Sequence, residues 1–150
     1  MSFQIPQEAE CPFCGYLSGA AGCAFVTRSD LVSAFLNPAQ FERGAALVIP
    51  NEHVSSLLEV EHHVVSAVYH ECQRLARGMV KAFGAVGLNV FQNNGVKAGQ
   101  TVSHYHVHLV PRYEFSEPGR LFRATEYPRT PLAELLKVAA ELREALASAA

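Results

Sequence analysis

The sequence predicts one α+β domain, in which a five-stranded antiparallel sheet is combined with one long helix and a C-terminal helix. Three observations predict it: five short apolar runs, one long segment with helical periodicity, and a length of 150 residues, which is ordinary for a single domain. Hydrophobic residues make up 49% and charged residues 17%, as in globular chains that bury their own core.

Five apolar runs have the length and composition of β-strands. They lie at residues 24–27, 31–36, 45–50, 87–92 and 103–111. The break between the first two is short enough for a hairpin, so we expect an antiparallel meander.

The clearest helical period covers residues 57–83, where apolar residues recur at steps of three and four. Cys72 falls on the apolar face and is expected in the core, whereas three histidines fall off that face and should be exposed. These are His62, His63 and His70.

A second helix is expected near the C-terminus. A polar stretch runs from Pro111 to Pro128, and Thr130 and Pro131 then look like an N-cap followed by a proline in the first helical position. We therefore predict a helix from about Leu132.

Charge and hydropathy exclude several classes of partner. The net charge of −2 provides no general positive field, so neither nucleic acid nor an anionic membrane surface is an expected partner. No apolar run approaches the roughly 20 residues of a membrane span, and residues 1–10 do not read as a secretory signal. We expect a cytoplasmic protein with reduced cysteines.

Three histidines alternate with apolar residues near position 106. In a strand, His104, His106 and His108 would share one face, while the residues between them would face the core. Such a row can chelate zinc, as in metal hydrolases. It can also supply a neutral imidazole that attacks phosphorus. The row alone leaves both chemistries open.

The segment before this row favours phosphate. Residues 93–95 (NNG) and 98–101 (AGQT) form a turn-rich loop whose small residues, amides and hydroxyl can direct hydrogen-bond donors at phosphate oxygens. The loop is a candidate phosphate cradle.

The stretch GQTVSHYHVHLVPR, residues 99–112, resembles the signature of the histidine-triad (HIT) family, with a weaker match from about Cys11 onwards. The resemblance is to zinc-containing bacterial HIT hydrolases and to nucleotide hydrolases of the Fhit and Hint types. It implies a HIT-like fold over residues 9–115, with residues 116–150 as an extension of the same domain. It also implies a homodimer with part of the interface on the long helix.

The resemblance assigns roles to individual residues. It makes His106 the nucleophile that becomes nucleotidylated, and it places His108 against the phosphoryl group and the leaving atom. Asn37 takes the position that contacts the sugar hydroxyls. The phosphate-contacting positions are Asn93, Gly99, Gln100 and Thr101. In one departure, many members carry a histidine after Gly44, where this chain has Ala45.

The pair Cys11 and Cys14 has the two-residue gap of both zinc knuckles and thiol–disulfide enzymes. The preceding polar residues 3–10 cannot form the buried strand that a redox pair normally follows, which favours zinc. Two cysteines leave a tetrahedral site half filled. The resemblance implies His53 and His104 as the other ligands of a closed, structural zinc site, while Cys23 is expected to be an ordinary small residue.

Together these features predict a hydrolase or transferase that releases a nucleoside monophosphate, with AMP as the expected product. The expected substrates are dinucleoside polyphosphates or nucleoside phosphoramidates, and magnesium bound to a polyphosphate substrate can assist. Two alternatives are a regulatory nucleotide-binding module with little turnover and a zinc hydrolase whose metal is chelated by the triad.

Overall fold

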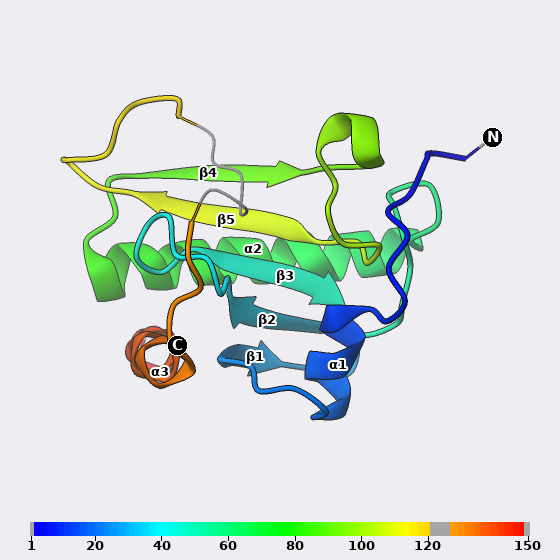
Figure 1. The fold of residues 1–150 in the computed structure, drawn as a ribbon. Coiled ribbons are helices and arrows are strands. Elements are labelled where there is room, and N and C mark those ends of the chain that lie inside the picture. Colours follow the sequence, from blue (N-terminus) through cyan, green and yellow to red (C-terminus); the bar gives the residue numbers. More distant parts are fainter. Residues whose placement is uncertain (1, 121–126, 149–150) are drawn as a thin grey trace.

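A computed structural model of the protein describes residues 2–120 and 127–148. Five strands form one antiparallel sheet in the order β1-β2-β3-β5-β4 (Figure 1). They are β1 (Phe25–Arg28), β2 (Val32–Leu36), β3 (Ala46–Pro50), β4 (Gly87–Gln92) and β5 (Val107–Arg112). The predicted α+β class and five-stranded sheet are confirmed. The meander holds only for the first three strands, because β5 lies between β3 and β4.

Three α-helices and one 3₁₀ turn complete the fold: α1 (Pro12–Ser18), α2 (His62–Phe83), η1 (Val96–Ala98) and α3 (Leu132–Ala147). The prediction that the long helix begins at residue 57 is wrong. Residues 57–59 form a turn in which the Ser56 carbonyl accepts hydrogen bonds from the amides of Glu59 and Val60. Leu57 and Leu58 therefore remain exposed, although they fit the apolar period.

The predicted strand at 103–111 is also too long. Pairing with β3 begins only at Val107, and His108 lies opposite Leu47. The residues before Val107 do not pair with β3; the Tyr105 amide instead donates to the Val54 carbonyl at 2.7 Å. The alternation survives this change, because the side chains of Tyr105, Val107 and Leu109 are all in the main core.

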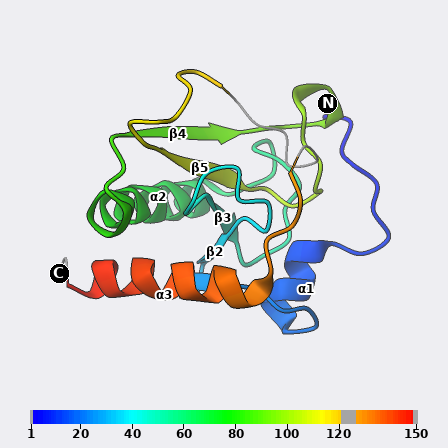
Figure 2. The same cartoon turned by 60° about the vertical axis from the view of Figure 1, so that its left-hand side comes forward.

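Both faces of the central strands are buried, which explains their continuous apolar runs. On one face, alternate residues of β2 and β3 pack with α2 and α3 in the main core, and Cys72 lies there as predicted. On the other face, Phe35, Leu47 and Ile49 pack against Phe13 and Tyr16 of α1. Figures 1 and 2 show α2 running along one face of the sheet. The helix histidines His62, His63 and His70 lie on the surface of α2 and are exposed, as predicted.

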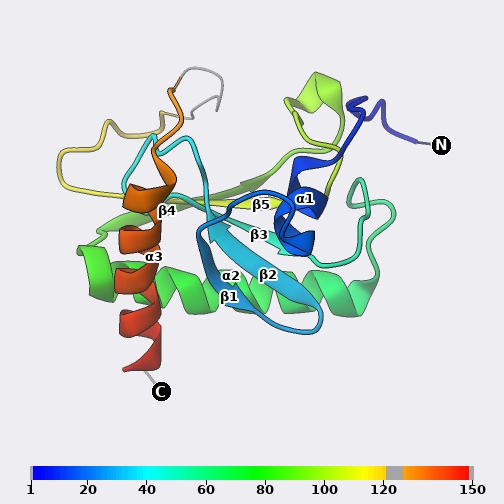
Figure 3. The ribbon, with the colours of Figure 1, turned by 60° about the horizontal axis from the view of Figure 1, so that its bottom comes forward.

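Helix α3 crosses one end of α2 (Figure 3), so the C-terminal extension packs into the same core as the sheet. The helix begins one residue later than the predicted cap requires: Pro131, not Thr130, is its N-cap. The Thr130 amide instead donates to the Pro38 carbonyl at 2.7 Å. None of the helices in the described ranges has the length and apolar character needed to cross a membrane.

Candidate active site and metal cluster

A cavity of about 220 Å³ opens on the face of the sheet opposite α2. It brings together four of the predicted site residues, which come from the end of β2, the loop before β5 and β5 itself. They are Asn37, Thr101, His106 and His108. Asn93, Gly99 and Gln100 are not among the described residues that line it.

His106 is buried and its ring is oriented by the backbone. Its Nδ1 lies 2.6 Å from the carbonyl oxygen of His104, so Nδ1 carries the proton that this oxygen accepts, and Nε2 keeps a free lone pair. Burial lowers the pKa of His106, although the His104 carbonyl and then Glu8 oppose the shift. The imidazole is therefore neutral and suited to nucleophilic attack.

His108 is held by stacking. Its ring lies parallel to that of Phe91, with centroids 4.4 Å apart, and 4.9 Å from the ring of His106. Its buried Nδ1 has no hydrogen-bond partner among the described residues. Burial lowers the pKa of His108 to about 3, and His106 adds to the shift. With Nδ1 unpartnered, the proton of the neutral ring is better placed on Nε2, where it can be donated to a ligand.

The predicted phosphate loop is shaped by Gln100. This buried amide donates to the carbonyls of Ser55 and Val102 at 2.8 and 2.9 Å and accepts from the Gly95 amide at 2.6 Å. Its side chain therefore holds the loop, and the exposed Thr101 lines the cavity. Asn93 lies 3.5 Å from the Gly99 carbonyl.

Asn37 follows β2 directly and is 5% exposed. Its Oδ1 accepts the Ala39 amide at 3.0 Å, which turns the chain sharply at the cavity wall. The side-chain NH₂ group has no protein acceptor among the described contacts, which leaves it available to a ligand hydroxyl.

The four predicted metal ligands converge beside this cavity. One ligand atom from each of Cys11, Cys14, His53 and His104 lies within 4.8 Å of all the others. The Cys14 Sγ is 3.3 Å from His53 Nδ1 and 3.7 Å from His104 Nδ1. Ligand atoms around a tetrahedral zinc are about 3.3–3.8 Å apart. The spacing and the two-sulfur, two-nitrogen donor set fit zinc.

The hydrogen bonding of His104 prepares it as a ligand. Its Nε2 donates to the Pro50 carbonyl at 2.8 Å, which leaves the Nδ1 lone pair directed at the two thiols. Burial lowers the pKa of His104 to about 4, so its imidazole is neutral. Burial, and then the nearby Cys11, raises the pKa of Cys14 to about 11. A metal cation would displace the proton of this thiol on binding.

Of the three histidines in the row, only His104 belongs to the metal cluster. His106 and His108 are not members of it, so among the described residues no group resembles a triad-chelated metal. Magnesium prefers carboxylate oxygens, and no carboxylate is among the described residues that line the cavity. The expected role for magnesium therefore has no support in this site.

Sequence reasoning missed helix α1 and much of the cavity wall. Cys11 is the N-cap of α1, its Sγ accepting the Cys14 amide at 3.4 Å, so the cysteine pair opens a helix after all. Phe13 and Tyr16 project from this helix into the cavity, where Phe13 lies 5.2 Å from the His106 ring. Proline after Cys11 and the three-residue aromatic spacing were the available signals.

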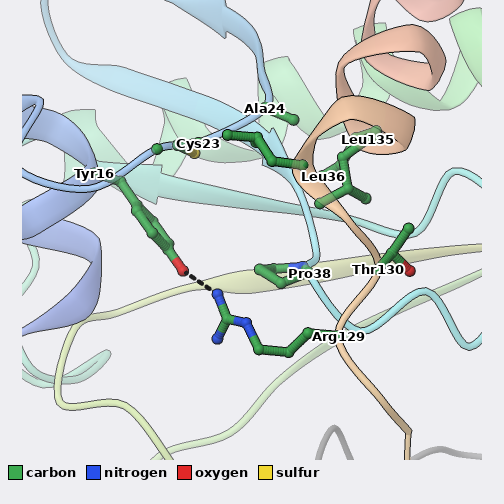
Figure 4. Close-up of a pocket in the computed structure, with 10 residues that line it drawn as sticks. Tyr16, Cys23, Ala24, Leu36, Pro38, Arg129, Thr130 and Leu135 are labelled. Atoms are coloured by element: carbon green, nitrogen blue, oxygen red, sulfur yellow. Dashed lines mark hydrogen bonds between the residues drawn. The ribbon is translucent and has the colours of Figure 1, made fainter.

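Two further wall residues, Tyr127 and Arg129, come from the C-terminal segment. The Arg129 guanidinium donates to the Tyr16 hydroxyl at 3.2 Å, where a second cavity of about 150 Å³ adjoins the first (Figure 4). This contact joins residues 113 positions apart, and no local pattern signals it.

Comparisons with known proteins agree with the signature. The sequence model of the HIT domain matches residues 19–115. Protein hit of Bacillus subtilis is 39% identical over 103 residues, 69% of this chain and 71% of that protein. Adenosine 5'-monophosphoramidase hnt1 of Schizosaccharomyces pombe is 35% identical over 102 residues, 68% of this chain and 74% of that protein.

Among solved structures, the fold is similar to that of a zinc-bound histidine triad family protein from Mycobacterium smegmatis. The TM-score is 0.80 at 32% sequence identity, and the match covers 93% of this chain and 95% of that one. This chain therefore belongs to the HIT family, a class of proteins with nucleotide-processing members.

Proposed function

We propose that this protein is a nucleotide hydrolase or transferase that releases a nucleoside monophosphate through a nucleotidyl intermediate on His106. The expected substrates are dinucleoside polyphosphates or nucleoside phosphoramidates, with AMP as the first product to test. The observation that carries the proposal is the hydrogen bonding of His106. Its Nδ1 donates to the His104 carbonyl, which leaves the Nε2 lone pair free, and the residue lines the cavity.

The reaction proceeds in two displacements at phosphorus. The Nε2 of His106 attacks the α-phosphorus, the P–N bond forms, and the bond to the leaving group breaks with its electron pair. Water then attacks the same phosphorus: a P–O bond forms, the P–N bond breaks with its electron pair returning to Nε2, and the proton lost by the water passes to solvent. This step releases the monophosphate and restores the neutral imidazole. His108 and Thr101 line the cavity, and in this mechanism the Nε2 proton of His108 and the Thr101 hydroxyl stabilise the charge on the phosphoryl oxygens.

Other residues hold the substrate and the loop. Asn37 would bind the sugar hydroxyls through its side-chain amide. For Gln100, Asn93 and Gly99 we propose a supporting role. The Gln100 side chain fixes the loop, and the loop backbone faces the phosphate. The aromatic rings of Phe13 and Tyr16 provide a flat apolar wall for the base.

For the metal cluster we propose one structural zinc, held by Cys11, Cys14, His53 and His104. A bound zinc would fix the N-terminal segment and the His104 backbone, whose carbonyl orients His106. Free thiols suit the reducing cytoplasm that we expect for this protein.

We also propose a homodimer. Strand β4 is an edge of the sheet, and a groove of about 550 Å³ between it and α2 is lined by Tyr69, Leu88 and Val90. Tyr69 and Val90 are 46% and 43% exposed, and an open edge strand beside apolar side chains favours pairing with a second copy. Val90→Glu should shift the protein from dimer to monomer in sedimentation, whereas a monomeric wild type would contradict the proposal.

The decisive test of function is turnover. Purified wild type and His106→Ala are incubated with diadenosine tri- and tetraphosphate and with adenosine phosphoramidate, and AMP release is followed by chromatography. Loss of AMP release by about three orders of magnitude or more in a folded variant supports nucleophilic catalysis. Binding of adenylates without AMP release by wild type would instead favour a regulatory module.

A further inference from the structure

The catalytic cavity has a polar end that the reaction at phosphorus does not use. Tyr16, Pro38 and Arg129 line both this cavity and the adjoining smaller one, whereas His106 and His108 line only the first. The pair Tyr16 and Arg129 therefore stands at the end away from the histidines. With phosphorus at His106 and the sugar at Asn37, this end faces the base.

Arg129 is held at this position by its neighbours. The adjacent Thr130 amide donates to the Pro38 carbonyl at 2.7 Å, and the Arg129 guanidinium itself donates to the Tyr16 hydroxyl at 3.2 Å. Figure 4 shows the two side chains approaching from opposite walls, Tyr16 from α1 and Arg129 from the C-terminal segment. The C-terminal extension thus completes the cavity.

The donors at this end exceed the acceptors. Arg129 is the only lysine or arginine among the described lining residues, and it forms no ion pair with any carboxylate in the described ranges. A guanidinium has five N–H donors and no acceptor, and only one donor is used by Tyr16. The Tyr16 oxygen accepts this bond, so its own O–H is free to donate.

An end with more donors than acceptors favours a base edge that carries acceptors. Guanine presents two adjacent acceptors, O6 and N7, which a guanidinium fork matches in a bidentate pair. Adenine presents N7 beside an amino group, so one of the two donors would face another donor. Adenosine substrates remain acceptable through N7 but lose one hydrogen bond.

We propose that Arg129, positioned by Tyr16, is the base-specificity residue of this site and that it favours 6-oxopurine nucleotides over adenine nucleotides. The proposal rests on the proposed function, because a nucleotide must occupy the cavity. It assigns the choice of base to a segment outside residues 19–115, the part that the HIT domain matches.

The test measures binding, which needs no turnover. GMP, IMP and AMP are titrated by calorimetry into wild type, Arg129→Gln and the matched control Arg77→Gln, whose arginine is exposed on α2 and lines neither cavity. We expect wild type to bind GMP and IMP about tenfold more tightly than AMP. Arg129→Gln should reduce this ratio to within twofold, Tyr16→Phe should reduce it partly, and Arg77→Gln should keep it.

The outcomes separate the two proposals. Equal affinity for the three nucleotides, a preference for AMP, or a GMP preference that survives in Arg129→Gln would overturn the base assignment while leaving the proposed function intact. Failure of wild type to bind any of the three nucleotides would overturn the proposed function and the base assignment with it. Weaker binding of all three by the same factor in Arg129→Gln would reduce Arg129 to a non-selective contact and overturn its specificity role.

Discussion

The Nδ1 atom of His106 lies 2.6 Å from the backbone carbonyl oxygen of His104, whose own Nδ1 faces the thiols of Cys11 and Cys14. One residue therefore belongs to the metal cluster through its side chain and orients the catalytic imidazole through its backbone. Replacing a ligand of the cluster should therefore alter the orientation of the His106 ring, although His106 is not itself a ligand.

Substitutions at Cys11 and His106 should affect metal content differently, because only Cys11 belongs to the cluster. Wild type should contain one zinc per chain by elemental analysis, Cys11→Ala should lose it, and His106→Ala should keep it. Because the cluster fixes the His104 backbone, Cys11→Ala should also lower kcat/KM by about tenfold or more. Loss of zinc from His106→Ala with retention in Cys11→Ala would instead assign the metal to the triad.

The N-terminal segment is clamped to the loop before β5. Glu8 Oε1 accepts hydrogen bonds from the Ser103 amide at 2.8 Å and the Ser103 hydroxyl at 2.7 Å. Glu8→Ala should lower the free energy of unfolding by about 2 kcal/mol, since bonds to charged groups contribute about 1.5–3 kcal/mol. The matched control is Glu10→Ala, at an exposed position two residues away. Equal effects of the two changes in urea unfolding would show that the clamp adds no stability.

The close packing of α2 against α3 at Gly78 predicts the sign of the stability change when this glycine is replaced. A Cβ added at Gly78 in α2 would lie 2.9 Å from Leu142 Cδ1 and 2.8 Å from Leu146 Cδ2 of α3. Gly78→Ala should therefore destabilise the protein by about 1–3 kcal/mol, through overpacking. Without that contact, the better helix propensity of alanine would stabilise it by up to about 1 kcal/mol. An increase in Tm would therefore contradict the observed α2–α3 packing.

The buried His108 predicts acid sensitivity. Its pKa is about 3 in the folded protein, because burial penalises the charged form, and its ordinary value is 6.5. Below pH 6.5 His108 takes up a proton in the unfolded chain but not in the folded chain. Protonation therefore favours the unfolded state, and the free energy of unfolding falls as the pH is lowered from 6.5 towards 3. The stability difference between wild type and His108→Gln should fall by about 1.4 kcal/mol per pH unit between pH 6 and 4. A difference independent of pH in urea unfolding would contradict this burial.

The fold and the metal ligands were largely predictable, because they depend on local patterns and on a specific signature. The apolar runs placed the strands close to their observed positions, and the resemblance brought Cys11 and His53 together across the chain. The start of α2 was not predictable from periodicity, since Leu57 and Leu58 fit the helical period but lie in a turn.

The rest of the site depends on tertiary contacts that no local pattern encodes. His104 was expected in a strand. Instead, its carbonyl accepts a hydrogen bond from the His106 ring, and its own ring donates to the Pro50 carbonyl. Arg129 reaches Tyr16 across 113 residues, from a segment that reads as polar and featureless. Ala45, the departure from the family pattern that the sequence indicated, packs with Phe41 and Val110, in a cluster that also contacts Tyr127.

Detection of the nucleotidyl adduct on His106 is the sharpest test of the proposed mechanism. Wild type mixed with adenosine phosphoramidate is quenched within its first turnovers, and intact and peptide masses are recorded beside those of His106→Ala. We expect a mass increase corresponding to one nucleotidyl group, mapped to His106 and absent from the variant. AMP release without any adduct, or an adduct that persists in His106→Ala, would contradict it.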